Sequence, residues 1–171
     1  MWRFRINGWH QLVLVFCCSL SLFLCSCRET TFQSSVPTYP VRVVIDTKLG
    51  PFVHFQPTVM GSYIVVNGDG YFVNGTRVMA LGATDRYGYG GVVVYVSMYG
   101  YDAYDLACPY CAQHGMKRSC SVSGFYAECP ECGERYDLVS GYALPTQSIS
   151  HEALRRLNVI NSDGKLTVTQ R

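Results

Sequence analysis

The chain has 171 residues, of which 49% are hydrophobic and 15% are charged. This length allows one domain of ordinary size with an N-terminal extension. The formal net charge is only +2, and no run of lysine and arginine exceeds two residues, which excludes a basic nucleic-acid-binding protein. No glycine-rich loop follows a strand and opens a helix, so the sequence predicts no nucleotide partner.

The N-terminal segment has the features of an export signal. Arg3 and Arg5 precede an apolar run at 12–24 that is too short for a comfortable membrane span. The run ends at Leu24-Cys25-Ser26-Cys27, which resembles the lipobox of a bacterial lipoprotein. The resemblance implies that residues 1–26 are a signal peptide, that Cys27 is the lipidated N-terminus, and that residues 27–40, rich in Ser, Thr and Pro, are a tether.

The alternative for this segment is an uncleaved N-terminal anchor helix. Both readings place the protein in the bacterial cell envelope, anchored to a membrane and facing the periplasm or the cell surface. Removal of the signal also changes the count of cysteines. Of the nine cysteines, Cys17, Cys18, Cys25 and Cys27 belong to the signal and anchor, so five remain in the domain. An odd number argues against complete disulfide pairing.

The segment that follows the tether predicts strands joined by tight turns. Asn67-Gly68-Asp69-Gly70 and Asn74-Gly75 lie between apolar runs, and Asn-Gly favours the type I′ turn of a hairpin because both central residues need a positive φ. The run at 91–96 is almost continuously apolar, which is typical of a strand buried on both faces. The expected strands in this part of the chain are 41–45, 63–66, 71–73, 76–81, 91–96 and 103–107.

Two short cysteine motifs come next, Cys108-Pro109-Tyr110-Cys111 and Cys129-Pro130-Glu131-Cys132, with 17 residues between them. This spacing is a recognised zinc signature, and four thiolates also hold iron or an iron–sulfur cluster. The spacing therefore predicts a metal site formed by all four cysteines. Cys120 lies between the motifs without a partner at ligand spacing, which indicates a small buried residue or, alternatively, a redox-active thiol.

The remainder of the chain continues the β pattern. Residues 135–139 alternate like a strand, and the turn Asn161-Ser162-Asp163-Gly164 joins strands expected at 157–160 and 166–169. One helical turn is expected at 150–157, with Ser150 as its N-cap. The fold class is therefore all-β, with the cysteine motifs on loops at strand ends.

The region around the cysteines resembles the Rieske domain family. The resemblance rests on Ala107-Cys108-Pro109, on Cys129-Pro130-Glu131-Cys132-Gly133 followed by Tyr136-Asp137, and on the closing Asp163-Gly164 turn; it spans residues 41–171. It implies a β sandwich or barrel with a two-loop metal-binding subdomain, at 107–115 and 128–135, that holds a 2Fe-2S cluster and transfers single electrons. The implied partner is a redox protein of the envelope.

The chain departs from the Rieske pattern at both histidine ligands. Tyr110 occupies the place of the first histidine, so Cys111, one residue later, is the expected substitute, and Cys132 stands in the place of the second. His114 is the nearest imidazole and is otherwise a surface histidine. Thiolates in place of neutral imidazoles add negative charge, which should lower the reduction potential toward about −400 mV.

The identity of the metal stays open. One tetrahedral zinc would be saturated by the four thiolates, which makes a structural site without redox function. Arg3-Phe4-Arg5 is not a twin-arginine signal, so a chain exported unfolded would arrive without a cluster, which favours zinc or oxidised cysteines. The family resemblance favours the 2Fe-2S cluster.

Two other functions compete with the electron carrier. Cys108-Pro109-Tyr110-Cys111 has the sequence of a glutaredoxin active site, although here it comes late in the chain and in β surroundings. A binding module stapled by metal would use tyrosines of 84–104 as its contact surface; the alternative is that they form cross-strand pairs. No hydrolytic constellation is present, so catalysis is not expected.

Overall fold

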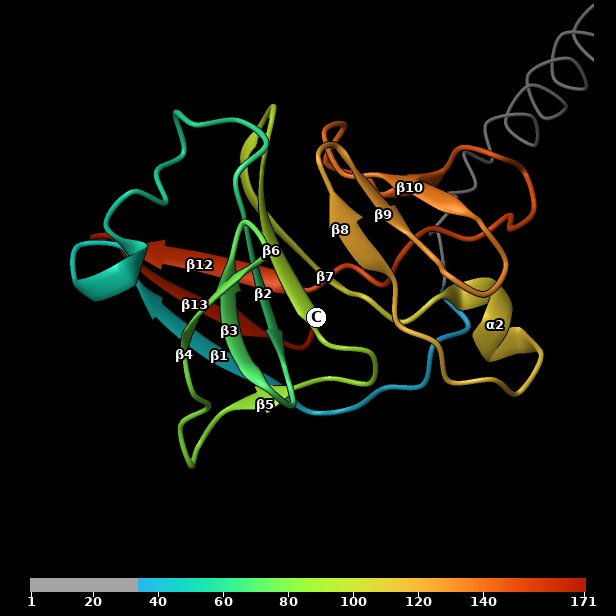
Figure 1. Cartoon of the computed structure of the whole chain (residues 1–171), viewed down its shortest axis with the longest axis horizontal. Coiled ribbons are helices and arrows are strands. Elements are labelled where there is room, and N and C mark those ends of the chain that lie inside the picture. The colour runs from blue at the N-terminus through green and yellow to red at the C-terminus, as the bar shows by residue number, and fades with distance from the viewer. Residues whose placement is uncertain (1–33) are drawn as a thin grey trace, which may run out of the picture. The chain divides into compact units, whose positions relative to one another are not determined.

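The computed structural model describes residues 34–171, which form three antiparallel sheets and one short α-helix (Figure 1). The predicted all-β class is confirmed. The first sheet has the order β12-β13-β1-β5, with bounds Asn158–Ser162, Lys165–Thr169, Val41–Asp46 and Arg86–Tyr87. The second has the order β4-β3-β2-β6-β7, with bounds Thr76–Met79, Gly70–Val73, Tyr63–Asn67, Val92–Ser97 and Gly100–Asp105.

The third sheet is smaller and lies beside the helix at one end of the domain (Figure 1). Its order is β11-β10-β9-β8, with bounds Leu144–Pro145, Arg135–Asp137, Tyr126–Glu128 and Ser121–Ser123. The helix α2 covers Pro109–Gln113, and a 3-10 turn, η1, covers Gly50–Phe52. No helix among the described residues is long and apolar enough to cross a membrane.

The predicted hairpins form where the turn chemistry placed them. Asn74 and Gly75, between β3 and β4, have φ values of 47° and 84°, as a type I′ turn requires. Asp163 and Gly164, between β12 and β13, have φ values of 51° and 80°. Local backbone sterics therefore favour both turns, and pairing and packing of the strands within the sheets stabilise the hairpins.

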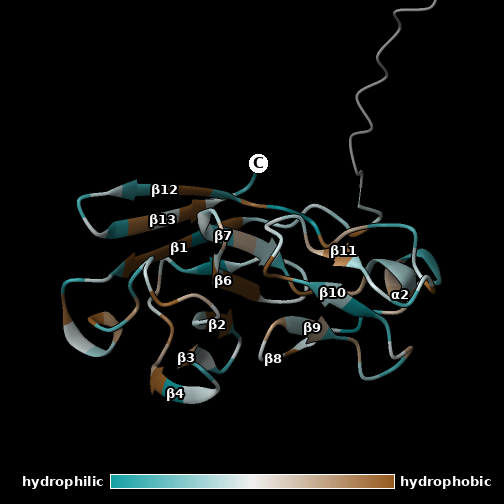
Figure 2. Ribbon diagram, turned by 90° about the horizontal axis from the view of Figure 1, so that it is seen from above, coloured by the Kyte–Doolittle hydropathy of each residue, from teal (hydrophilic) through white to brown (hydrophobic). Residues whose placement is uncertain are grey.

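The strand β6, which lies between β2 and β7 in the second sheet, separates two hydrophobic cores. Val92, Val94 and Val96 face a core formed with β1, β2 and β13, whereas Val93 and Tyr95 face a second core that contains the domain cysteines. All six residues of β6 are buried, because both faces of the strand are covered. Figure 2 shows the apolar colouring of β6 and β1 and the hydrophilic colouring of β10. The continuous apolar run predicted for this strand reflects this position.

The predicted helical turn at 150–157 is wrong. This segment is irregular and lies along β7 instead, where Asp105 donates its N–H to the carbonyl of Arg155 at 2.9 Å and Leu157 donates to Ala103 at 2.8 Å. Ser150 caps no helix. The physical reason is that β7 is an edge strand with unpaired backbone groups, and pairing with them satisfies more hydrogen bonds than one isolated turn would.

Several expectations concern residues outside the described part of the chain. The signal peptide at 1–26 and the lipidation of Cys27 lie there, and of the tether at 27–40 only residues 34–40 are described. Within this stretch, Val36 is buried, and its carbonyl accepts a hydrogen bond from the guanidinium of Arg155. The last residues before β1 are therefore packed onto the domain.

Candidate metal centre

The first cysteine motif opens helix α2. Cys108 is the N-cap, with extended backbone angles (φ −69°, ψ 118°), and Pro109 occupies the first helical position, where its missing N–H costs nothing. The N–H of Ala112 donates to the carbonyl of Cys108 at 3.0 Å, closing the first turn. Cys111 lies within this turn. Its sulfur therefore lies on the same side of the helix as Cys108.

The second motif is a tight turn between β9 and β10. Gly133 donates its N–H to the carbonyl of Cys129 at 2.9 Å, and Cys129 donates to the carbonyl of Glu134 at 2.9 Å. Gly133 has a φ of +75°, which a residue with a Cβ adopts only with strain. The two cysteine side chains of this turn therefore lie on one side of it.

The structure brings the four predicted ligands together. Their Sγ atoms all lie within 4.8 Å of one another. Cys108 Sγ is 3.6 Å from Cys132 Sγ, and Cys111 Sγ is 3.7 Å from Cys129 Sγ. A metal–sulfur bond of about 2.3 Å in a tetrahedron gives sulfur–sulfur separations of about 3.8 Å, so the donor set fits one tetrahedral ion.

All five described cysteines are free thiols in this arrangement. Cys108, Cys111 and Cys129 are at most 1% exposed, and Cys132 is partly exposed. The sulfurs form part of the second core, packed with Leu106, Tyr136, Leu138 and Leu154. Three of the four predicted ligands are therefore buried, and Cys132 is the one that is partly exposed.

The surroundings shift the protonation of the thiols in opposite directions. Hydrogen bonding from Cys120, and then from Tyr136, lowers the pKa of Cys108, against the effect of burial. Burial raises the pKa of Cys111 and of Cys132. Because metals bind the thiolate form, a cation entering this site would displace protons, so affinity should fall in acid.

Two residues close to the sulfurs had no functional role in the sequence prediction. The hydroxyl of Tyr136, a fully buried side chain, lies 3.5 Å from Cys108 Sγ. Glu134 is a fully buried carboxylate only two residues after Cys132. The signal for both was their position just after the second motif, where Glu134 and Tyr136 are buried on either side of the exposed Arg135.

The other candidate residues lie outside the four-sulfur group. Cys120 is 5% exposed, as a small buried residue would be. The His114 ring packs against Tyr110 at a tilt of 42°, with ring centroids 4.5 Å apart, and its Nδ1 lies 2.8 Å from the Tyr110 carbonyl oxygen. Among the tyrosines proposed as a contact surface, Tyr95 and Tyr104 are buried, whereas Tyr99 is 74% exposed. The tyrosines of this region therefore do not form one surface.

The glutaredoxin-like alternative lacks its usual setting in residues 34–171. The helix that Cys108 opens has only five residues, and the sheets are antiparallel. Both cysteines of the motif face two further cysteines in place of open solvent. The arrangement suits shared metal ligation better than thiol exchange at an exposed sulfur.

Comparisons with known proteins identify similar folds but no family. No family model and no curated protein matches the chain. One similar solved chain belongs to the complex of reduced oxygenase and oxidized ferredoxin in carbazole 1,9a-dioxygenase; its identity is 21%, its TM-score 0.40, and the match covers 67% of this chain and 87% of that one.

Two further solved chains are ferredoxins. The ferredoxin of carbazole 1,9a-dioxygenase from Nocardioides aromaticivorans IC177 has 17% identity and a TM-score of 0.40, with 77% of this chain and 98% of that one covered. The Sphingomonas yanoikuyae B1 ferredoxin has 16% identity and a TM-score of 0.37, with 68% and 94% covered. This likeness is partial, and it adds nothing to the chemistry of the four sulfurs.

Proposed function

We propose that this domain holds one metal centre through Cys108, Cys111, Cys129 and Cys132 and that it is a one-electron carrier of Rieske-like architecture. The observation that carries the proposal is the convergence of four Sγ atoms within 4.8 Å, from two loops at one end of a β domain. Iron held by thiolates, alone or as a 2Fe-2S cluster, changes its charge by one electron, and the anionic ligands favour a low potential.

Two features of the chain support a redox role. Cys132 is the partly exposed sulfur, so it offers an edge of the site through which an electron could reach a partner. The Tyr136 hydroxyl lies on the buried side, 3.5 Å from Cys108 Sγ. Hydrogen bonds to ligand sulfurs are one of the means by which a protein tunes the potential of such a centre.

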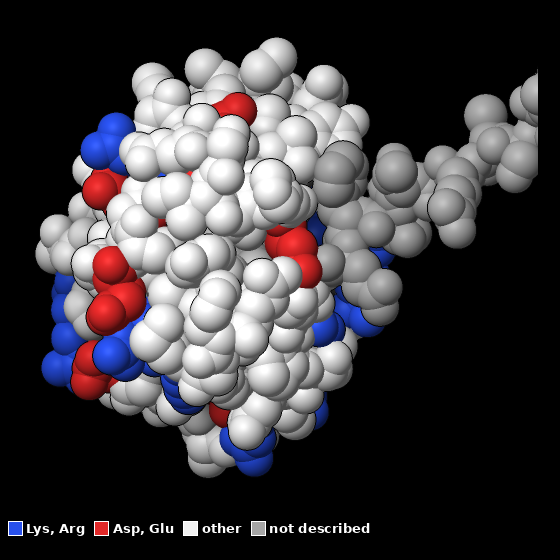
Figure 3. All heavy atoms as spheres, turned by 90° about the vertical axis from the view of Figure 1, so that its right-hand side faces the viewer, with Lys and Arg blue, Asp and Glu red and all other residues white. Residues whose placement is uncertain are grey.

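The face that carries this edge suggests how a partner would meet it. Figure 3 shows the side of the domain where α2 and the third sheet lie, and uncharged residues cover most of it. The charged pairs of the two cysteine loops are exposed and mutually neutralised; Arg118 pairs with Glu131 at 2.9 Å, and Arg135 with Glu128 at 2.8 Å. Contact with an envelope redox protein would therefore depend little on long-range charge steering.

A zinc site is the second candidate, and the sulfur spacing favours it. The close pairs at 3.6 Å and 3.7 Å match one tetrahedral ion. A 2Fe-2S cluster divides four thiolates between two irons, so some of the four Sγ atoms, which all lie within 4.8 Å of one another, would have to move apart to admit it. With zinc, the four cysteines would staple the second core, and the domain would act as a module that binds an envelope partner.

The proposed location follows from the sequence. Lipidation of Cys27 would hold the domain at a membrane of the cell envelope, with residues 27–40 as the lipidated tether. A radiolabelled fatty-acid incorporation assay on the full chain and on Cys27→Ala tests this point. Label that persists in Cys27→Ala would contradict the assignment.

Metal analysis of protein purified from its native envelope tests the function, because an expression host can supply the wrong ion. The electron-carrier proposal expects iron, visible absorbance, and a paramagnetic signal in one oxidation state. One zinc per chain with no visible absorbance would replace it with the stapled module. A protein with no bound metal and with disulfides between these cysteines would overturn both.

A further inference from the structure

The segment 146–152, here called the strap, links the third sheet to the stretch that runs along β7. It has no regular secondary structure, yet carboxylates hold it at both ends. One carboxylate belongs to the second cysteine loop and binds the strap. The other belongs to the strap itself and binds the first cysteine loop. The strap therefore touches both loops that supply the sulfurs.

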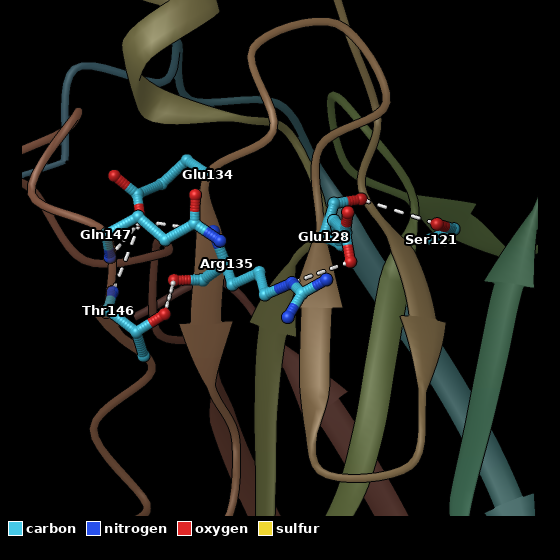
Figure 4. Close-up of polar contacts among 6 residues, drawn as sticks. All are labelled: Ser121, Glu128, Glu134, Arg135, Thr146 and Gln147. Atoms are coloured by element: carbon cyan, nitrogen blue, oxygen red, sulfur yellow. Dashed lines mark hydrogen bonds and ion pairs between the residues drawn. The ribbon is translucent and has the colours of Figure 1, made fainter.

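The carboxylate of Glu134 is surrounded by backbone N–H groups of the strap. Oε1 accepts from Thr146 at 3.2 Å and Gln147 at 2.9 Å, and Oε2 accepts from Ile149 at 2.8 Å and Ser150 at 2.7 Å. The N–H of Arg135 adds a fifth contact, at 3.1 Å to Oε1. Figure 4 shows Glu134 directed at Thr146 and Gln147.

Burial of a carboxylate is costly unless donors replace the lost water, and these five donors do so. Glu134 is fully buried, and its two carboxylate oxygens share the five N–H groups between them. Ser148 has a φ of +61°, which turns the flanking N–H groups toward one point. The strap is thus shaped as a cradle for this one carboxylate.

Glu134 is also part of the second cysteine loop. Its carbonyl oxygen accepts the N–H of Cys129 at 2.9 Å, and it follows Cys132 by two residues. One residue therefore closes the turn that holds two sulfurs and binds the strap. Movement of the strap would pull on that turn.

At the other end of the strap, Glu152 binds the first cysteine loop. Its Oε1 accepts from Nε2 of Gln113 at 2.5 Å, and Gln113 is the last residue of the helix that carries Cys111. The same carboxylate accepts the hydroxyl of Ser35 at 2.6 Å and its backbone N–H. The strap thereby connects helix α2 with the N-terminal segment.

We propose that the strap is a brace that holds the two cysteine loops in register, with Glu134 and Glu152 as its positioning residues. The inference rests on the proposed metal-binding function and deepens it, because it names what keeps the four sulfurs close before and after a metal binds. The two carboxylates act in series, so loss of either one frees the same strap.

Zinc release tests the brace in the full chain. Zinc-loaded wild type, Glu134→Gln, Glu152→Gln and the double variant are mixed with an excess of a chromophoric chelator, and the release rate is recorded. Glu128→Gln is the matched control, because the Glu128 carboxylate also lies next to the second cysteine motif but is half-exposed and pairs with the Arg135 side chain in place of the strap. We expect release to be about tenfold faster in Glu134→Gln, several-fold faster in Glu152→Gln, and within twofold of wild type in the control.

The double variant separates a brace from two local effects. Residues in series give non-additive effects, so the double variant should release zinc no more than about twofold faster than Glu134→Gln. Two results would overturn the proposal. One is a double variant in which the rate increases of the two single variants multiply, and the other is a release rate of Glu134→Gln equal to that of the control.

Hydrogen exchange of the metal-free chain gives a second readout, independent of metal binding. The N–H groups of Ala112 and Met116, which bond to Cys108 and Cys111 at 3.0 Å and 2.9 Å, report on the first loop. Glu134 lies on the second loop, yet Glu134→Gln should speed the exchange of these two N–H groups on the first loop. Unchanged exchange of Ala112 and Met116 would count against the brace. A chain that binds no metal but shows this effect would refute the proposed function and leave the brace intact.

Should Glu134→Gln fail to fold, Glu152→Gln carries the test, because its carboxylate binds Gln113 and Ser35 at exposed positions. Zinc release several-fold faster than in Glu128→Gln would support the brace, and release at the rate of that control would overturn it.

Discussion

The hydroxyl of Tyr136 lies 3.5 Å from the Sγ of Cys108, and both side chains are almost fully buried. Burial raises the pKa of Tyr136, and the neighbouring Cys108 raises it further, so the phenol keeps its proton and can donate it to a thiolate. The contact joins β10, the strand that follows the second cysteine motif, to the first cysteine motif.

Tyr136→Phe removes this donor without a large change in volume. We expect a loss of about 1 kcal/mol in the free energy of unfolding and, with iron bound, a lower reduction potential, because a hydrogen bond to sulfur stabilises the more negative state. Urea denaturation and protein-film voltammetry measure the two effects. Tyr95→Phe is the control, since Tyr95 is equally buried but its hydroxyl bonds to the Gly124 carbonyl at 3.3 Å. An equal shift of potential in the two variants would contradict the role of Tyr136.

The ligand set predicts which cysteines matter for metal content. Cys111→Ser should abolish stoichiometric metal binding, because a neutral hydroxyl is a far poorer ligand than a thiolate. Cys120→Ser should bind one equivalent as wild type does, because Cys120 lies outside the four-sulfur group although it is buried beside it. Mass spectrometry under native conditions, with atomic absorption, counts the metal. Loss of metal in Cys120→Ser would show that the ligand set is wrong.

Removal of the metal should affect the two cores unequally. The strands of the third sheet bury at most one residue each, so this region depends on the sulfurs for much of its packing. A chelator should therefore lower amide protection in β8, β9 and β10, while β1 and β13, in the other core, keep theirs. Hydrogen exchange with mass spectrometry tests this. Equal loss of protection in β1 would mean that the cores unfold as one unit.

Gly90 is a close-contact position next to the first loop. A Cβ at this residue would lie 2.2 Å from the backbone N of Ala107 and 2.5 Å from its Cα. Gly90→Ala should therefore displace Ala107 and its neighbour Cys108, cost about 1–3 kcal/mol, and weaken metal binding. Gly68→Ala is the control, because its nearest neighbour is the Tyr87 hydroxyl at 3.4 Å. Thermal unfolding and competitive chelation test the pair, and wild-type affinity in Gly90→Ala would contradict the prediction.

The buried tyrosines predict a loss of stability in alkali. Burial raises the pKa of Tyr71 and Tyr104 well above the usual 10.0 and that of Tyr95 to about 12. For these groups the folded state favours the neutral phenol, whereas the unfolded state ionises from pH 10 upward. Their contribution is therefore complete below pH 10 and decreases as the pH rises toward 12 and beyond. Denaturation at pH 8, 10 and 11, with tyrosinate absorbance at about 295 nm, should show these tyrosines ionising only on unfolding. Stability that stays constant to pH 11 would contradict this.

The sequence by itself determined what depends on neighbouring residues. Asn74-Gly75 specifies a hairpin because few residue pairs adopt two successive positive φ angles, and the apolar run in β6 marks a strand covered on both faces. Each Cys-x-x-Cys motif likewise determines a local turn that directs two sulfurs the same way.

Only the tertiary structure decided how these pieces act together. The segment 150–157 pairs with the edge of β7, 50 residues earlier in the chain, and so forms no helix. The register of α2 against the β9–β10 turn sets the sulfur separations and leaves Cys132 as the partly exposed ligand. The sequence gives no sign that Glu134 is buried, and its carboxylate is satisfied by backbone N–H groups that follow it by 12 to 16 residues. Such long-range contacts are chosen by the free energy of the whole packed domain, which no local pattern of residues encodes.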